Sequence, residues 1–216
     1  NPELINGSAA FSQTSPSVAF NGSVYLVVWT DNRNLLDNDI YGARLDSNGI
    51  LIDQAGIMIC KAPGNQKNPA VESNGDIFLV VWEDDRKNEI TGTDIYGTRV
   101  SGDGIIMDPD GFVVSEAVDL QEVPKVASVD ENFFVVWSDH RTGTNNDIYG
   151  TLVSSGGSIS HPDGLAVCTQ SSWQGYPDIS ADATRYFLVW ADQRGFSKDI
   201  YGVFIKTDCT ISHTNG

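Results

Sequence analysis

Four segments of the chain carry an aromatic residue, an acid and a base at alternating positions. The segment YLVVWTDNR at 25–33 contains Trp29, Asp31 and Arg33. The same Trp-x-Asp-x-Arg pattern starts again at Trp82, Trp137 and Trp190. On a β-strand, residues i, i+2 and i+4 share one face, so the acid and the base would lie side by side. Such a pair could transfer protons or hold a ligand.

Repetition argues against catalysis at these positions, because an active site is needed only once. Each set is followed by Asp-Ile-Tyr-Gly, which starts at Asp39, Asp94, Asp147 and Asp199. We therefore expect a structural network in every repeat, in which the Arg pairs with both types of Asp and fixes the intervening loop, while Trp and Tyr pack. A repeated ligand or cation site is the alternative. No catalytic residue is assigned here.

The elements that must position these residues belong to an internal repeat of about 54 residues. The four Trp are 53, 55 and 53 residues apart, and a third signature, Gln-x-x-Pro, precedes each set at Gln13, Gln66, Gln121 and Gln174. The repeats span 13–65, 66–120, 121–173, and 174–216 together with 1–12. β-Branched and aromatic runs bounded by Gly, Asn, Asp and Pro predict four short strands in each. Units of this size are typical of propeller blades.

The two ends of the chain complement each other. Residues 210–216 align with 158–164, where the third repeat is about to begin its fourth strand, whereas Leu4-Ile5-Asn6 resembles a fourth strand without a blade. We predict one all-β domain over 1–216. It is a four-bladed β-propeller of four-stranded antiparallel blades, closed by the N-terminal strand pairing beside 201–205. A monomer is expected. The alternative is an open half-ring completed by a second molecule, as an eight-bladed or swapped dimer.

Composition excludes some partners. The chain has 13 Lys and Arg against 29 Asp and Glu, a formal net charge of −16, which would repel nucleic acid. No run of 18 apolar residues is present, so membrane insertion is not expected. The start lacks the features of a signal peptide, so any export leader would already be removed. Cys60 and Cys168 occupy equivalent positions in opposite repeats, which predicts mainly free thiols.

Acidic loops supply oxygen donors for calcium. They contain Asp37-Asn38-Asp39, Asp103, Asp108-Pro109-Asp110 and Asp130-Glu131. None of these loops has the EF-hand spacing of donors, Gly and terminal Glu. We expect no required cofactor, leave a structural or central Ca²⁺ ion open, and assign no metal ligand.

Two groups of residues are candidates for ligand binding. Gln13, Gln66, Gln121 and Gln174 precede the strands that would line the central channel, so their side chains could ring its mouth; hydrogen bonds that cap a turn are the alternative. Trp173 departs from the repeat, since Ser12, Asn65 and Leu120 are its equivalents. With Tyr176 it could form an aromatic platform for a sugar ring or a partner loop.

The run PAVESNGDIFLVVWEDDR at 69–86, continuing through DIYGTRVSGDGIIMDPDGFVVS at 94–115, resembles repeats found in secreted or surface-anchored bacterial and archaeal proteins. The resemblance covers essentially the whole chain and implies a propeller scaffold and a secreted or cell-surface location. It does not specify an activity. Leu152 and Phe204 stand where the earlier repeats have Arg44 and Arg99, so strict fourfold ligand binding is not implied.

Two classes of function follow. The first is a non-enzymatic extracellular binding or assembly module that contacts glycans or another surface protein through loops at one face of the ring. The alternative is a carbohydrate-active enzyme, a glycosidase or lyase with its site at the channel mouth. For the enzyme, two acids unique to single repeats must converge to about 5 to 10 Å. Glu72 and Asp178, near equivalent inner strands, are the candidate pair.

Overall fold

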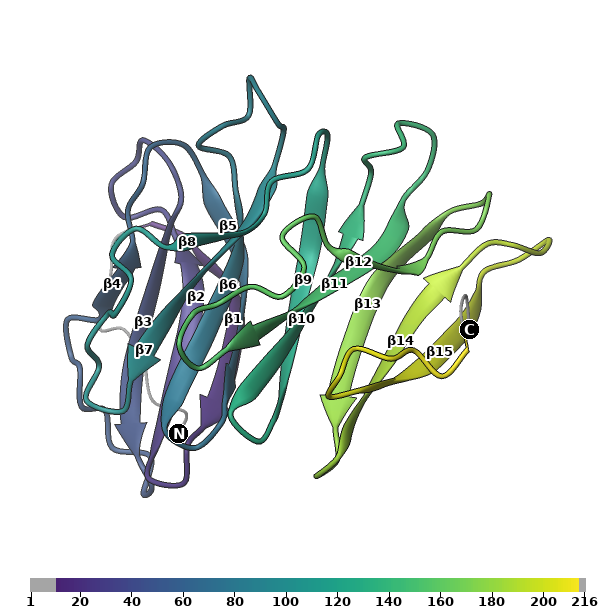
Figure 1. Ribbon diagram of the computed structural model, residues 1–216. Coiled ribbons are helices and arrows are strands. Elements are labelled where there is room, and N and C mark those ends of the chain that lie inside the picture. Colours follow the sequence, from purple (N-terminus) through teal and green to yellow (C-terminus); the bar gives the residue numbers. More distant parts are fainter. Residues whose placement is uncertain (1–10, 214–216) are drawn as a thin grey trace.

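The computed structural model describes residues 11–213 and is built from β-strands joined by turns and loops (Figure 1). In chain order its strands are β1 (Gln13–Phe20), β2 (Val24–Asp31), β3 (Asp39–Asp46), β4 (Ile57–Cys60), β5 (Gln66–Ser73), β6 (Ile77–Asp84), β7 (Asp94–Ser101), β8 (Phe112–Ser115), β9 (Gln121–Val129), β10 (Asn132–Asp139), β11 (Asp147–Ser154), β12 (Leu165–Cys168), β13 (Gln174–Ala181), β14 (Arg185–Asp192) and β15 (Asp199–Lys206). Within this described part, no helix is long and apolar enough to cross a membrane.

Each sequence repeat forms one antiparallel sheet, which we call a blade. Blades 1, 2 and 3 are β1–β4, β5–β8 and β9–β12, and blade 4 is β13–β15. The predicted all-β repeat is therefore confirmed, with four short strands in blades 1 to 3. Blade 4 has three strands among the described residues.

The register within a blade brings the two conserved motifs together. In blade 1, β2 pairs with β3 over its whole length, so that Trp29 lies opposite Tyr41 and Asp31 opposite Asp39. The other three blades repeat this register. Because the paired strands are eight residues each and have no irregularity, the motifs meet at the same end of every blade.

The Gln-x-x-Pro signature marks a β-bulge rather than the residues before a strand. Each Gln is the first residue of its inner strand, and the pairing register shifts just after it. The residue before each Pro has a positive φ of 51–55°, and these four residues are Ser15, Asn68, Val123 and Tyr176. Proline lacks an N–H donor, so it fits a point where the ladder of hydrogen bonds is interrupted.

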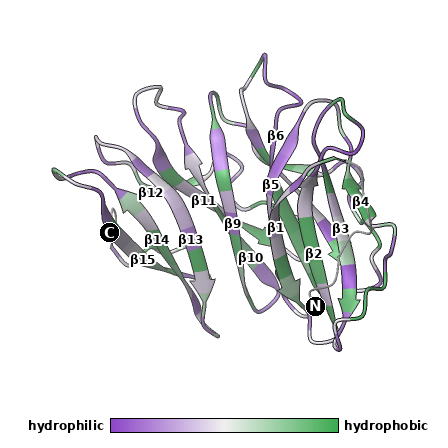
Figure 2. Ribbon diagram, turned by 180° about the vertical axis from the view of Figure 1, so that it is seen from behind, coloured by the Kyte–Doolittle hydropathy of each residue, from purple (hydrophilic) through white to green (hydrophobic). Residues whose placement is uncertain are grey.

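The hydrophobic core lies between blades, not inside them. Three apolar layers fill the spaces between successive blades; the first, for example, packs Leu26, Val28 and Ile40 of blade 1 against Phe78 and Val80 of blade 2. Figure 2 shows green, hydrophobic stretches along the strands and mostly white or purple loops. A single blade cannot bury both faces, so the blades depend on one another for stability.

Gly111 illustrates how tightly the fourth strands approach the tryptophans. Its φ is +78°, and a Cβ atom there would lie 2.6 Å from the ring of Trp82. Only glycine combines this backbone conformation with so little space. Gly164 meets Trp137 in the same way, so the glycine that opens the fourth strand is required by packing.

The four blades follow one another along an arc, with blades 1 and 4 at opposite ends (Figures 1 and 2). Substantial contacts link the inner strands of neighbouring blades, β1 with β5, β5 with β9 and β9 with β13, and within residues 11–213 none of comparable extent links blade 1 with blade 4. The predicted closing strand, Leu4-Ile5-Asn6, lies outside the described residues. The structure therefore shows a propeller-like array of four blades and does not show ring closure.

Candidate functional site

The Trp, Asp and Arg side chains of the repeated Trp-x-Asp-x-Arg motif are joined by hydrogen bonds. In blade 2, Asp84 is fully buried and accepts hydrogen bonds from the indole N–H of Trp82 at 2.8 Å and from the guanidinium of Arg86 at 2.6 and 2.8 Å. The backbone N–H of Arg86 donates to the same carboxylate at 3.0 Å. The arginine also stacks 3.9 Å from the ring centre of Tyr96. These hydrogen bonds pair the buried carboxylate with the arginine and stabilise the blade.

The second carboxylate of the motif behaves differently from the prediction. Asp39, Asp94 and Asp147 do not form the ion pair with the arginine; the arginines pair with the Asp two residues before them. Asp94 instead accepts a hydrogen bond from Thr91 Oγ1 at 2.9 Å, and its Oδ1 has no partner. Burial raises the pKa of all three carboxyl groups to about 6. The guanidinium pairs through Nε and Nη2 with the first carboxylate, and the second carboxylate is left buried and poorly paired.

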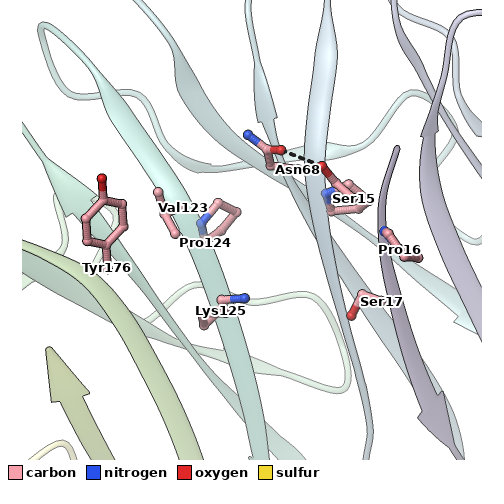
Figure 3. A pocket seen from close by; sticks show the side chains of 9 residues that line it. Ser15, Pro16, Ser17, Asn68, Val123, Pro124, Lys125 and Tyr176 are labelled. Carbon is pink, nitrogen blue, oxygen red and sulfur yellow. Dashed lines mark hydrogen bonds between the residues drawn. The ribbon is translucent and has the colours of Figure 1, made fainter. Parts of the chain in front are cut away.

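The four bulges converge on one groove of about 360 Å³. It is lined by Ser15, Pro16, Ser17, Asn68, Pro69, Val123, Pro124, Lys125 and Tyr176, all from the inner strands β1, β5, β9 and β13 (Figure 3). The residue two positions after each Gln differs from blade to blade, although its backbone conformation does not. A repeated frame therefore presents four different side chains to one cavity.

A chain of hydrogen bonds runs along this groove across three blades. Ser15 Oγ donates to Asn68 Oδ1 at 2.9 Å, and Asn68 Nδ2 donates to Glu83 Oε2 at 2.9 Å (Figure 3 shows the first of these). Glu83 Oε1 accepts the bulge N–H of Val123 at 2.8 Å. Burial raises the pKa of Glu83, and its hydrogen bonds oppose that shift. We assign Glu83 as a positioning residue that fixes two residues of the groove.

Sequence reasoning missed Glu83 and most of the groove. In the repeat, the residue after each Trp is Thr30, Glu83, Ser138 and Ala191. Thr30 Oγ1 accepts the bulge N–H of Asn68 as Glu83 accepts that of Val123. The signal that could have found them is variation at two fixed positions of the repeat: the residue after each Trp and the residue two after each Gln. The repeated scaffold itself does not require these positions to differ between blades.

The four glutamines lie behind the groove rather than among the residues that line it. Gln66, Gln121 and Gln174 are fully buried. Their side-chain amides donate to carbonyl groups of the preceding loop, such as Ala117 and Asp119 for Gln121. This placement matches the turn-capping alternative. Ligand binding by the glutamines stays a prediction.

The structure brings Trp173 and Tyr176 together. Their ring centres are 5.4 Å apart in an edge-to-face arrangement, and Lys198 Nζ lies 3.9 Å from the centre of the Trp173 ring. Tyr176 is exposed and lines the groove, whereas Trp173 stands behind it against Gly175. The predicted aromatic platform therefore reaches the groove through Tyr176; its role in binding stays a prediction.

The candidate acids Glu72 and Asp178 lie on the inner strands of blades 2 and 4, β5 and β13, with β9 between them. Asp178 is exposed and is the repeat equivalent of Ser17 and Lys125, which both line the groove. Burial raises the pKa of Glu72, which favours its protonated form. A carboxyl group with a raised pKa suits the role of a general acid.

Within the described residues 11–213, no group of three or more His, Cys, Asp or Glu side chains is placed to hold a metal ion. One of the acidic loops already has a structural role: Asp108 accepts two hydrogen bonds from the Arg99 guanidinium at 2.7 and 2.9 Å. The Ca²⁺ ion left open by the sequence stays untested.

The three cysteines are free, as predicted. Burial raises the pKa of Cys60 and Cys168 to about 11, and it also raises the pKa of the less buried Cys209. Because the thiolate is the reactive form, we expect Cys60 and Cys168 to react with a disulfide reagent only after unfolding. Thiol titration of the native protein should modify Cys209 first. Equal rates for all three thiols would contradict this.

Comparisons with known proteins identify a fold but no family. No family model matches the chain, and the curated proteins contain no significant match. Among solved structures, an α-L-arabinofuranosidase from Lactobacillus brevis is 14% identical with a TM-score of 0.58, over 98% of this chain and 78% of that one. A thermostable family-43 glycoside hydrolase is 12% identical with a TM-score of 0.60, over 94% and 76%. An arabinanase from Bacillus subtilis is 10% identical with a TM-score of 0.55, over 97% and 76%.

These neighbours correct the functional expectation. The sequence favoured a non-enzymatic binding or assembly module and made catalysis the less favoured choice, but the three structures named above are carbohydrate hydrolases, which supports the alternative. The preference was wrong because repetition of the Asp and Arg motifs was taken as evidence against catalysis, whereas the groove lies at the bulges, where the blades differ. At these identities the likeness shows the fold alone.

Proposed function

We propose that this chain is a carbohydrate-active enzyme of the glycoside-hydrolase type that binds its substrate in the groove formed by the four bulges. The observation that carries the proposal is the convergence of Ser15, Asn68, Val123 and Tyr176 on one cavity. The similarity of the fold to glycoside hydrolases supports it. Hydroxyl, amide and aromatic groups together suit a sugar, which offers hydroxyl groups at its edge and C–H groups on its face.

Within this proposal Glu72 and Asp178 are the acid pair. Glu72 holds a proton more firmly than an ordinary glutamate and would protonate the leaving-group oxygen. Asp178, exposed on β13 at the repeat equivalent of Ser17 and Lys125, would act as the carboxylate partner. The two carboxyl groups must approach within about 5 to 10 Å around the bound sugar. Tyr176 would stack on the sugar ring.

The test is hydrolysis of 4-nitrophenyl α-L-arabinofuranoside, chosen because one structural neighbour is an α-L-arabinofuranosidase. We expect turnover by the wild type and a loss of about 100-fold or more in kcat/KM for Asp178→Asn and Glu72→Gln, because general acid–base groups contribute that much. Tyr176→Ala should raise KM with less effect on kcat.

The matched control is Asp76→Asn, an exposed acid in the turn before β6, which should leave turnover unchanged. If the wild type neither hydrolyses arabinofuranosides and arabinan nor shows a thermal shift with arabino-oligosaccharides, the proposed function is wrong. Turnover that survives both acid substitutions would reject the acid pair alone.

Location and architecture complete the proposal. A secreted or cell-surface location is what the resemblance of the repeats implies, and it agrees with a polysaccharide substrate as the glycan partner. Closure of a four-bladed ring within one chain, through Leu4-Ile5-Asn6, is the sequence-based expectation for how the arc is completed.

A further inference from the structure

The last blade exposes a face that every other blade buries. Ile200 is 75% exposed, whereas its equivalents in blades 1, 2 and 3 are fully buried; these are Ile40, Ile95 and Ile148. Phe187 is 42% exposed, and its three equivalents are likewise fully buried; these are Leu26, Leu79 and Phe134. Within residues 11–213, the positions that pack against the next blade at each internal junction are therefore left uncovered in blade 4.

The first blade exposes the opposite face. Val18 is 58% exposed, whereas Val71 and Val126 at the same position are buried. Tyr25 is 38% exposed, and its fully buried equivalents are Phe78, Phe133 and Tyr186. In the internal junctions, these positions pack directly on the face that blade 4 leaves bare. The two exposed faces are therefore the two halves of one kind of interface.

Backbone geometry supports the same match. At each internal junction the N–H of the bulge glutamine donates to the carbonyl of the residue before the Asp-Ile-Tyr-Gly motif. The three bonds are Gln66 to Asn38 at 2.8 Å, Gln121 to Thr93 at 2.7 Å and Gln174 to Asn146 at 2.8 Å. In a fourth junction the N–H of Gln13 would donate to the carbonyl of Lys198, which holds the position of Asn38. Blades 1 and 4 stand at opposite ends of the arc, so a second chain can bring these two groups together (Figure 1).

We propose that blade 4 of one chain docks on blade 1 of a second copy, and blade 1 on blade 4 of that copy, so that two chains complete one closed ring. The partner is a second copy because the three internal junctions already show that this pair of faces is complementary. Both junctions of the ring are then of the internal type. The charge of −16 per chain opposes association, so added salt should strengthen the dimer by screening.

The experiment measures molecular mass by light scattering and sedimentation over a range of protein and salt concentrations. We expect the wild type to have twice the mass of the 23.4 kDa chain and to dissociate on dilution, more readily at low salt. Ile200→Asp and Val18→Asp should each be folded monomers by circular dichroism. Ile90→Asp, at a residue that is 78% exposed but lies in the loop between β6 and β7, should remain a dimer.

Mixing the two monomeric variants tests the head-to-tail arrangement. Blade 4 of Val18→Asp and blade 1 of Ile200→Asp are both intact, so the mixture should recover part of the dimer through one unaltered junction. A wild type that stays monomeric at its highest soluble concentration would overturn the proposal and favour closure within one chain. A mass that keeps growing with concentration would also overturn it, because it indicates an open filament. None of these readouts depends on the proposed enzymatic activity.

Discussion

Replacing Asp84 with Asn should lower the free energy of unfolding by about 3 to 5 kcal/mol. The Asp84 side chain is fully buried and Arg86 is largely buried, and four donors converge on the carboxylate. Asparagine keeps the shape but turns an amide N–H₂ toward the guanidinium, so a desolvated positive charge loses its counter-charge. Removing one partner of a buried pair costs far more than the pair itself contributes.

The measurement is urea denaturation followed by tryptophan fluorescence, with Asp182→Asn as the control. Asp182 also pairs with an arginine, Arg185, but both side chains are about half exposed, so little change is expected. The denaturation midpoint should fall for Asp84→Asn at an unchanged slope. An Asp84→Asn midpoint no lower than that of the control would show that the cluster does not stabilise the blade.

The second large effect is a loss of stability as pH rises. The pKa of Asp94 is raised from 3.8 to about 6, chiefly by burial, and one of its oxygens has no hydrogen-bond partner. A carboxyl group whose pKa is higher in the folded state stabilises the protein below its unfolded pKa, and this contribution is lost as pH rises through about 6. Two pKa units correspond to about 3 kcal/mol for one group. Asp39 and Asp147 act in the same direction.

We therefore expect the wild type to be less stable at about pH 7.5 than at about pH 4.5, and Asp94→Asn to reduce this difference by about 2 kcal/mol. The pH dependence, not the stability at a single pH, is the measured quantity, because the amide also changes local hydrogen bonding. Asp76→Asn, at an exposed turn, is the control and should leave the pH dependence as it is. A wild type whose stability rises over this range would contradict the assignment.

Sequence alone determined the repeat, the class of fold and the scaffold role of the repeated acids and bases. These follow from local rules. Residues two apart share a strand face, glycine and proline bound strands, and a motif that occurs once in every repeat has a role in every blade. Pairing of Asp84 with Arg86 needed only their spacing of two residues at the end of β6. The failure of Asp94 to join them could not be foreseen, because it depends on which carboxylate the guanidinium reaches in the folded blade.

Only the tertiary structure determined which differences between the blades form the groove and which faces of the blades are exposed. Ser15, Asn68 and Tyr176 are each separated from the next by more than 50 residues in the sequence. Only the curvature of the array brings their bulges into one groove. The exposed faces of blades 1 and 4 are a second example. Ile200 carries the same motif as the buried Ile40, and no local rule distinguishes them. Burial at a repeat position depends on whether another blade covers it, which is a property of the assembled array and not of the residues.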